Sequence, residues 1–205
     1  MLASKKDVVL VALKRNAEEL SSYQKKISVV DSHLAVSFAG LASDARVLLN
    51  LMKQQALSSK LTYGRPIPLN KVMSALGDRA QSNTQYYGKR PYGVGLIIAG
   101  IDEGGPHIYE FLPSGMTQEM LACAIGGRSQ MARTYLERHL TDFPDASREE
   151  LIQHGLKALK ESLSQEKELT VENTTVAIGG SEGFKQHDGQ DVAQFLEGLG
   201  EGAES

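Results

Sequence analysis

The chain has 205 residues, 41% of them hydrophobic, which is enough for one domain with a sizeable core. Its formal net charge is −3 at pH 7 and its basic residues are scattered, so we expect no nucleic acid as a principal partner. No apolar run approaches the roughly 20 residues of a membrane span, and residues 1–7 lack the order of a signal peptide, so we expect no membrane attachment. The single cysteine, Cys123, excludes an internal disulfide and fits a reducing, intracellular compartment.

The N-terminal part of the chain is predicted to form strands and then a pair of helices. Short β-favouring runs at residues 8–13, 27–30 and 34–39 are separated by polar stretches, and we interpret them as strands that begin an antiparallel sheet. Ser43 then offers a helix N-cap, and apolar residues recur at helical spacing up to about residue 57. A second helix is predicted for residues 70–87. Its apolar face consists of Val72, Met73, Leu76 and Ala80.

Strands return in the middle of the chain. Pro91 is expected to end the second helix, because proline disfavours the helical conformation at the residue before it. Residues 93–101 and 107–112 form apolar runs joined by a glycine-rich turn, which predicts a hairpin. A further strand is expected at residues 121–125, with Cys123 buried in it.

The C-terminal part is predicted to contain a second pair of helices, two closing strands and a short last helix. The helices are expected at residues 129–140 and 147–163, and Ser147 with Glu150 forms a capping box that starts the second of them. The strands are expected at 174–179 and 184–187, and the last helix at 191–199.

The order of these elements predicts the fold class. Helices that arrive in pairs argue against a parallel sheet and favour antiparallel sheets with helix pairs packed outside. We therefore predict an α+β fold, a four-layer α/β/β/α sandwich of two antiparallel sheets. We expect a single domain over residues 1–199 and an acidic, disordered tail over residues 200–205.

Ser181 is the sharpest candidate for enzyme chemistry. Residues 179–183 match G-x-S-x-G, the pattern with which an α/β-hydrolase presents its nucleophile. However, no helix pattern follows Ser181, and no acid and histidine follow it in the order that this fold requires. A glycine-rich hairpin turn is the simpler interpretation.

Neither a metal nor a cofactor is expected. The five histidines contain no H-x-x-x-H pair and have no cysteine companions, and the chain has no phosphate-binding loop of the Walker type. Lys26 follows Lys25 just before a predicted strand. From the residues alone, such a pair is usually a solvated strand end.

Several segments resemble proteasome alpha subunits in order and spacing, and together they cover nearly the whole chain. The segments are Val11-Ala-Leu-Lys-Arg-Asn16, Ser22-Tyr-Gln-Lys-Lys-Ile27, Ala39-Gly-Leu-Ala-Ser-Asp-Ala-Arg46, Arg90-Pro-Tyr-Gly-Val-Gly95, Ala124-Ile-Gly-Gly-Arg-Ser-Gln130 and Thr134-Tyr-Leu-Glu-Arg138. The Leu-Lys-Arg and Gln-Lys-Lys-Ile details look most like the type-1 (alpha-six) members of this family. The resemblance implies the N-terminal-nucleophile hydrolase fold, in agreement with the predicted sandwich.

The resemblance also implies that the chain is not an enzyme. Catalytic beta relatives use an N-terminal threonine, an aspartate, a lysine and a serine. Leu13 occupies the aspartate position and Gly127 the serine position, and only Lys26 matches. A lone lysine cannot activate a nucleophile that is absent. An active hydrolase, of the N-terminal-nucleophile type or using Ser181, is the alternative.

The function implied by the resemblance is that of a structural and gating subunit of the proteasome core particle, a threonine-type endopeptidase complex. Such subunits support ubiquitin-dependent protein degradation in cytoplasm and nucleus. The implied partners are other alpha subunits in a heptameric ring, beta subunits, and regulatory ATPases or other activators. Lys26, Gly40 and Leu41 match the pocket that receives the activator C-terminus. Family members also carry an N-terminal gate segment before the position of Met1, and we expect this chain to lack it.

Overall fold

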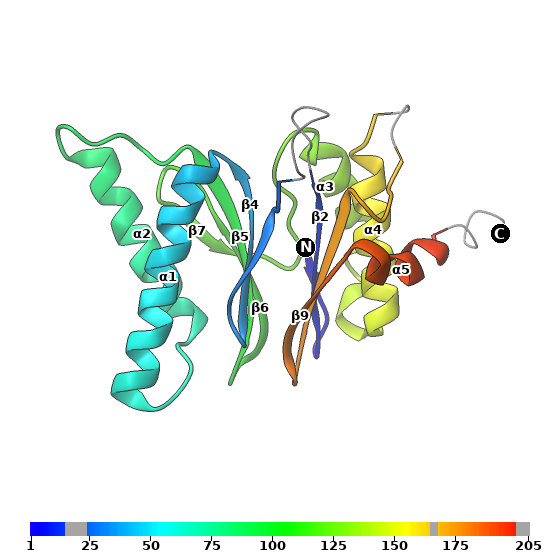
Figure 1. Ribbon diagram of the computed structural model, residues 1–205, viewed down its shortest axis with the longest axis horizontal. Helices are drawn as coiled ribbons and strands as arrows, with labels where there is room; N and C mark the ends of the chain where they lie inside the picture. The colour runs from blue at the N-terminus through cyan, green and yellow to red at the C-terminus, as the bar shows by residue number, and fades with distance from the viewer. Residues whose placement is uncertain (15–23, 165–167, 200–205) are drawn as a thin grey trace.

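Two antiparallel sheets lie face to face between two layers of helices (Figure 1). The computed structural model describes residues 1–14, 24–164 and 168–199, and within them the predicted four-layer α/β/β/α sandwich is confirmed. The predicted tail over residues 200–205 lies outside the described residues. None of the helices in the described ranges is both long enough and apolar enough to cross a membrane.

The first sheet has the strand order β1-β2-β8-β9 and the second has the order β3-β4-β5-β6-β7. The strands of the first sheet are β1 (Leu2–Ala3), β2 (Val8–Leu13), β8 (Thr174–Gly180) and β9 (Gly183–Asp188). The strands of the second sheet are β3 (Ile27–Asp31), β4 (Leu34–Gly40), β5 (Val94–Asp102), β6 (Gly105–Phe111) and β7 (Thr117–Glu119).

Each sheet is covered by helices on its outer face (Figure 1). The second sheet carries α1 (Ala42–Tyr63) and α2 (Leu69–Gln85). The first sheet carries α3 (Ser129–Arg138), α4 (Arg148–Glu161) and the short α5 (Ala193–Glu197). Two 3₁₀ turns, η1 (Phe143–Asp145) and η2 (Gly189–Val192), complete the described elements, and the predicted helix over 191–199 is divided between η2 and α5.

The first three predicted strands do not share one sheet, which corrects the sequence-based expectation. β2 pairs with β8 in antiparallel register from Val8↔Gly179 to Leu13↔Thr174, whereas β3 pairs with β4. β2 is buried on both faces, because Val9 packs toward the helices that cover its own sheet and Val8 and Leu10 pack toward the other sheet. A strand buried on both faces has no polar alternation that would indicate its neighbour.

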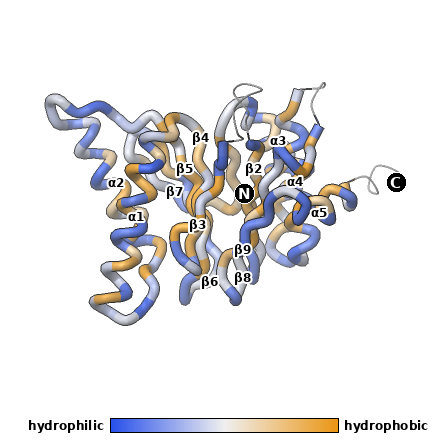
Figure 2. Tube along the Cα trace, in the orientation of Figure 1, coloured by the Kyte–Doolittle hydropathy of each residue, from blue (hydrophilic) through white to orange (hydrophobic). Residues whose placement is uncertain are grey.

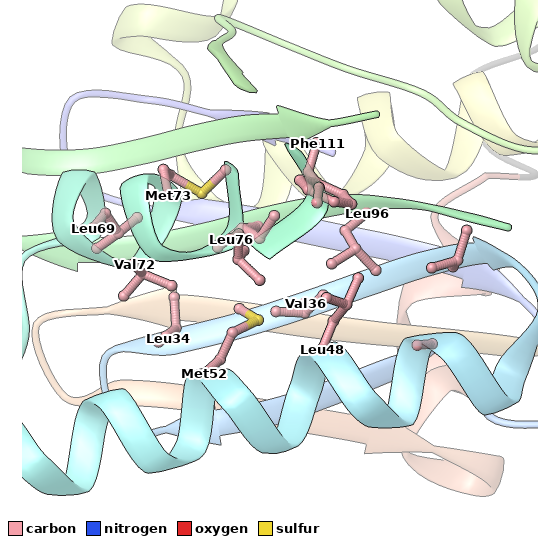
Figure 3. Close-up of a cluster of buried hydrophobic side chains, with 14 of the residues drawn as sticks. Leu34, Val36, Leu48, Met52, Leu69, Val72, Met73, Leu76, Leu96 and Phe111 are labelled. Carbon is pink, nitrogen blue, oxygen red and sulfur yellow. The ribbon is translucent and has the colours of Figure 1, made fainter. Parts of the chain in front are cut away.

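Three apolar layers hold the sandwich together, and the most hydrophobic stretches follow the strands (Figure 2). In the outer layer shown in Figure 3, Leu48 and Met52 of α1 point toward Val36 of β4, and Leu76 of α2 lies among the same side chains. The predicted apolar face of α2 is confirmed, since all four of its residues are buried. Full burial of each large aliphatic side chain stabilises the fold by about 1.5–3 kcal/mol.

Helix starts follow local capping chemistry in one case and a distant contact in another. At α4 the predicted capping box is confirmed, because the Ser147 hydroxyl accepts from the Glu150 N–H and the Glu150 carboxylate accepts from the Ser147 N–H. The predicted Ser43 N-cap is wrong. α1 begins at Ala42, and the N–H of the preceding Leu41 donates to the carbonyl of Gly93 at 2.8 Å.

Two further boundaries differ from the predictions. α2 ends at Gln85, before Pro91, because Tyr86 already has an extended conformation. The expected strand at residues 121–125 is absent, since this segment makes an isolated bridge, Leu2↔Ala122, to a β1 that is only two residues long. Cys123 is nevertheless buried, as expected.

Candidate functional site

A cavity of about 1350 Å³ lies between the sheets, at the end where β2 and β4 finish and β5 begins. Its walls are the ends of these strands, residues 123–129, and the facing sides of α3 and α4. It combines apolar side chains with exposed backbone from several glycines. A concave site with a mainly apolar lining and a few polar groups is the usual form of a binding site.

The three positions aligned with catalytic residues of beta relatives meet at this cavity. Leu13 at the end of β2, Lys26 before β3 and Gly127 before α3 all line it. Leu13 offers only an alkyl group and Gly127 has no side chain, so neither can take or give a proton. Lys26 is the one of the three that carries a reactive group.

The ammonium of Lys26 is held against the cavity wall. The side chain is half-buried, its Nζ donates to Gln24 Oε1 at 2.8 Å, and it lies 5.6 Å from the centre of the Phe38 ring. The carbonyl of Lys26 also accepts from the Phe38 N–H at 3.1 Å. A lysine placed over an aromatic face and hydrogen-bonded beside it is more restricted than a freely solvated strand end.

Gly40 lines the same cavity, and Leu41 lies beside it on the outer surface. Gly40 has φ +127°, and a Cβ at this position would stand 2.3 Å from the Gly93 oxygen. Only glycine therefore lets β4 approach the start of β5 so closely. Leu41 leaves 51% of its surface exposed. Of the three residues implied by the resemblance, the structure brings Lys26 and Gly40 to the cavity.

An ion pair lies next to Gly40 and Leu41. The Arg90 guanidinium donates to both oxygens of Asp44, at 2.7 and 2.9 Å, and the Gly93 N–H donates to the same carboxylate at 2.8 Å. The hydrogen bonds from Arg90, and next the one from Gly93, lower the pKa of Asp44 to about 2. Asp44 is therefore ionised at neutral pH, and the Arg90–Gly95 motif is fastened to the first turn of α1.

A second ion pair, which unlike the first lies in the cavity wall, was not predicted from the sequence. Arg133 Nη2 donates to Glu110 Oε1 at 2.8 Å, and Arg133 Nε donates to the Ala124 carbonyl at 2.8 Å. Burial, and next the charge of Glu110, raises the pKa of the adjacent Cys123 to about 11, so this thiol is not a nucleophile at neutral pH. The sequence signal that could have indicated this pair was a charged residue, Glu110 in β6 and Arg133 in α3, on an otherwise apolar face of its element.

Ser181 lies in the turn of a β-hairpin. Gly180 pairs with Gly183, so Ser181 and Glu182 form the connection between β8 and β9, and both are exposed. A strand rather than a helix follows, so the nucleophile elbow of an α/β-hydrolase is contradicted and the hairpin interpretation is confirmed. In the described ranges no three His, Cys, Asp or Glu side chains are grouped so that they could hold a metal ion.

The stacked sheets, the outer helix pairs and the cavity at one sheet end define the class of N-terminal-nucleophile hydrolase sandwiches. Residues 2–178 match the family described as "Proteasome subunit". The chain belongs to this family.

Similar proteins include the "Probable proteasome subunit alpha type-6" of Schizosaccharomyces pombe, 55% identical over 201 residues, which are 98% of this chain and 74% of the relative. The "Proteasome subunit alpha type-6" of Saccharomyces cerevisiae is 50% identical over 95% of this chain and 84% of its own. The "Proteasome subunit alpha type-1" of Dictyostelium discoideum is 42% identical over 95% of this chain and 79% of its own. The resemblance to the type-1 (alpha-six) members is confirmed. Proteasome alpha subunits are non-catalytic ring subunits of the core particle.

Proposed function

We propose that this chain works as a structural and gating subunit in the alpha ring of a proteasome core particle, and that its cavity edge receives the C-terminus of an activator. The observation that carries the proposal is the cavity at which Leu13, Lys26 and Gly127 meet. Its wall keeps a cation and lacks the partners that would turn this cation into a catalytic group. Recognition is the chemistry that remains.

The outer face of α1 supports assembly with other subunits. Val47, Leu57 and Leu61 are exposed on this helix, although its opposite face is already buried against the second sheet. Exposed apolar side chains gathered on one helix face are a feature of protein interfaces. The proposed neighbours are alpha subunits of a heptameric ring and beta subunits. The proposed unit is one domain over residues 1–199, in a complex of cytoplasm and nucleus that supports ubiquitin-dependent degradation.

Lys26 and Gly40 suit a terminal carboxylate as the activator group. An ammonium pairs strongly with a carboxylate, and glycine leaves backbone groups open to an incoming chain end. Leu41, exposed beside Gly40, would contact the apolar part of the same tail. Regulatory ATPases are the partners proposed for this site.

Replacement of Lys26 by alanine tests the docking role. The loss of one charge-assisted contact, about 1.5–3 kcal/mol, is expected to weaken binding of an activator tail at this site by about tenfold to hundredfold. The measurement is binding of a fluorescent peptide, copied from the C-terminus of a regulatory ATPase, to core particles that carry the variant. Peptide hydrolysis by particles whose gate is already open should not change.

Lys185→Ala is the matched control, because Lys185 is an exposed lysine in the β8–β9 hairpin that pairs with Glu182 at 3.0 Å. This variant should bind the tail as the wild type does. Unchanged binding by Lys26→Ala in fully assembled particles would show that Lys26 is only a strand-end lysine.

A further inference from the structure

We infer that Asp44 and Arg90 are positioning residues for the docking wall, by which we mean Gly40 and Leu41. This inference rests on the proposed docking function. Neither residue lines the cavity, and their effect would pass through the backbone of Gly93.

The contacts form one continuous chain from the ion pair to the wall. Arg90 fixes the Asp44 carboxylate with two hydrogen bonds, and this carboxylate accepts from the Gly93 N–H at 2.8 Å. On its other side, the Gly93 carbonyl accepts from the Leu41 N–H at 2.8 Å. The peptide groups of Gly93 therefore connect the ion pair to the docking wall.

Gly93 packs closely against both residues of the docking wall. The Gly93 oxygen approaches Gly40 so closely that a Cβ there would stand 2.3 Å away, and a Cβ on Gly93 would stand 2.7 Å from Leu41 Cδ1. These values show that the Gly93 backbone lies close against both Gly40 and Leu41, to the second of which it is also hydrogen-bonded, so a shift of Gly93 is expected to move this wall as well.

The ion pair also controls charge beside the wall. The Asp44 side chain is 9% exposed, and its negative charge is compensated by the guanidinium of Arg90. Without Arg90, an uncompensated carboxylate would remain three residues from Leu41 and would repel an incoming carboxylate. Loosening of the wall and this repulsion both weaken the preference for a terminal carboxylate.

The test compares Arg90→Gln with Arg148→Gln in assembled core particles. Arg148 is a matched control, because its guanidinium also pairs with one aspartate, Asp7, through two donors at 3.1 and 2.7 Å, in the other sheet's layers. The probe is a fluorescent peptide copied from a regulatory ATPase C-terminus, used with a free carboxylate and as the C-terminal amide. The ratio of the two affinities measures carboxylate recognition and is insensitive to general loss of stability.

Arg90→Gln is expected to lower this ratio by about threefold to tenfold, and Arg148→Gln should leave it unchanged. Arg90→Lys keeps the charge but loses the bidentate geometry, so its ratio of affinities should lie between those of Arg90→Gln and the wild type. This variant replaces Arg90→Gln in the test if Arg90→Gln is not incorporated into core particles.

Three outcomes would overturn the inference, and they are distinguishable. If Lys26→Ala abolishes the preference for the carboxylate, whereas Arg90→Gln and Arg90→Lys leave the ratio of affinities unchanged, the positioning role is wrong and the docking role of Lys26 is supported. If Arg148→Gln lowers it equally, the effect is general. If the wild type itself shows no preference for the carboxylate, the proposed docking function fails together with the positioning role.

Discussion

Gly40 shows how one residue without a side chain shapes the candidate site. Its φ of +127° and its approach to the Gly93 carbonyl are both closed to other amino acids. The sequence motif around Gly40 suggested a pocket residue. The structural reason that this position requires glycine is the close approach of Gly93, which lies just before β5 and is distant from Gly40 in the sequence.

Gly40→Ala is therefore expected to reduce the free energy of unfolding by about 3 kcal/mol, through backbone strain and a direct clash. The measurement is urea denaturation of the purified chain followed by circular dichroism. Gly64→Ala is the control, since Gly64 also has a positive φ, +67°, but a Cβ added there would meet nothing within 4 Å. That variant should lose only about 1 kcal/mol. Equal losses in the two variants would show that the close approach to Gly93 has no energetic cost.

At the scale of elements, α3 and α4 meet through a cluster of rings. Tyr135 and His139 of the α3 region lie against His154 of α4, and the Tyr135 hydroxyl is 3.0 Å from His154 Nδ1. Burial, and next the charge of His139, lowers the pKa of His154 below its usual 6.5, whereas Asp142 opposes this shift. The contact between the two helices is therefore built for a neutral His154.

Because the folded state disfavours the proton on His154, the corresponding stability is present above the unfolded pKa of 6.5 and is lost as pH falls through the lower folded pKa. The free energy of unfolding should therefore decrease as the pH falls below 6.5, and that of His154→Gln should decrease less over the same pH values. Urea denaturation of both chains at several pH values measures the difference. Parallel pH profiles would mean that His154 titrates alike in both states.

Local sequence patterns predicted the existence of the helices and strands better than the residues at which they begin and end. The α4 start followed from Ser147 and Glu150, because both capping partners lie within one turn. The α1 start could not be predicted, since it depends on Gly93 and Arg90, far away in the sequence. The cavity could be predicted only in part for the same reason. Lys26 and Gly40 were identified from a resemblance. The Glu110–Arg133 ion pair in the cavity wall could not be predicted, because it joins two elements that are distant in the sequence.

For the whole molecule, the layer order could be predicted from the succession of helix pairs and strands, whereas the membership of β2 in one sheet and of β3 in the other could not. That division depends on the long-range pairing of β2 with β8. As a result, Leu13 at the end of β2 and Lys26 just before β3 reach the same cavity from strands of different sheets.

The purified chain is expected to hydrolyse no fluorogenic peptide and to take up neither an epoxyketone nor a fluorophosphonate probe. The reason is that Leu13 and Gly127 cannot act as acid and hydroxyl, and Ser181 stands exposed in a hairpin turn. Mass spectrometry of the intact chain after treatment detects any adduct, with a catalytic beta subunit as the positive control. An adduct that disappears in Ser181→Ala would establish the serine hydrolase alternative.

The exposed residues of α1, Val47, Leu57 and Leu61, remain in contact with water for as long as the chain is alone. Covering such surface is favourable by about 25 cal/mol per Å², whichever molecule covers it, so copies of the free chain compete with the intended neighbours. Such attraction grows with concentration. The isolated chain should therefore precipitate at concentrations at which the assembled particle stays dissolved, and cells that synthesise it faster than its partners would accumulate an aggregation-prone surplus.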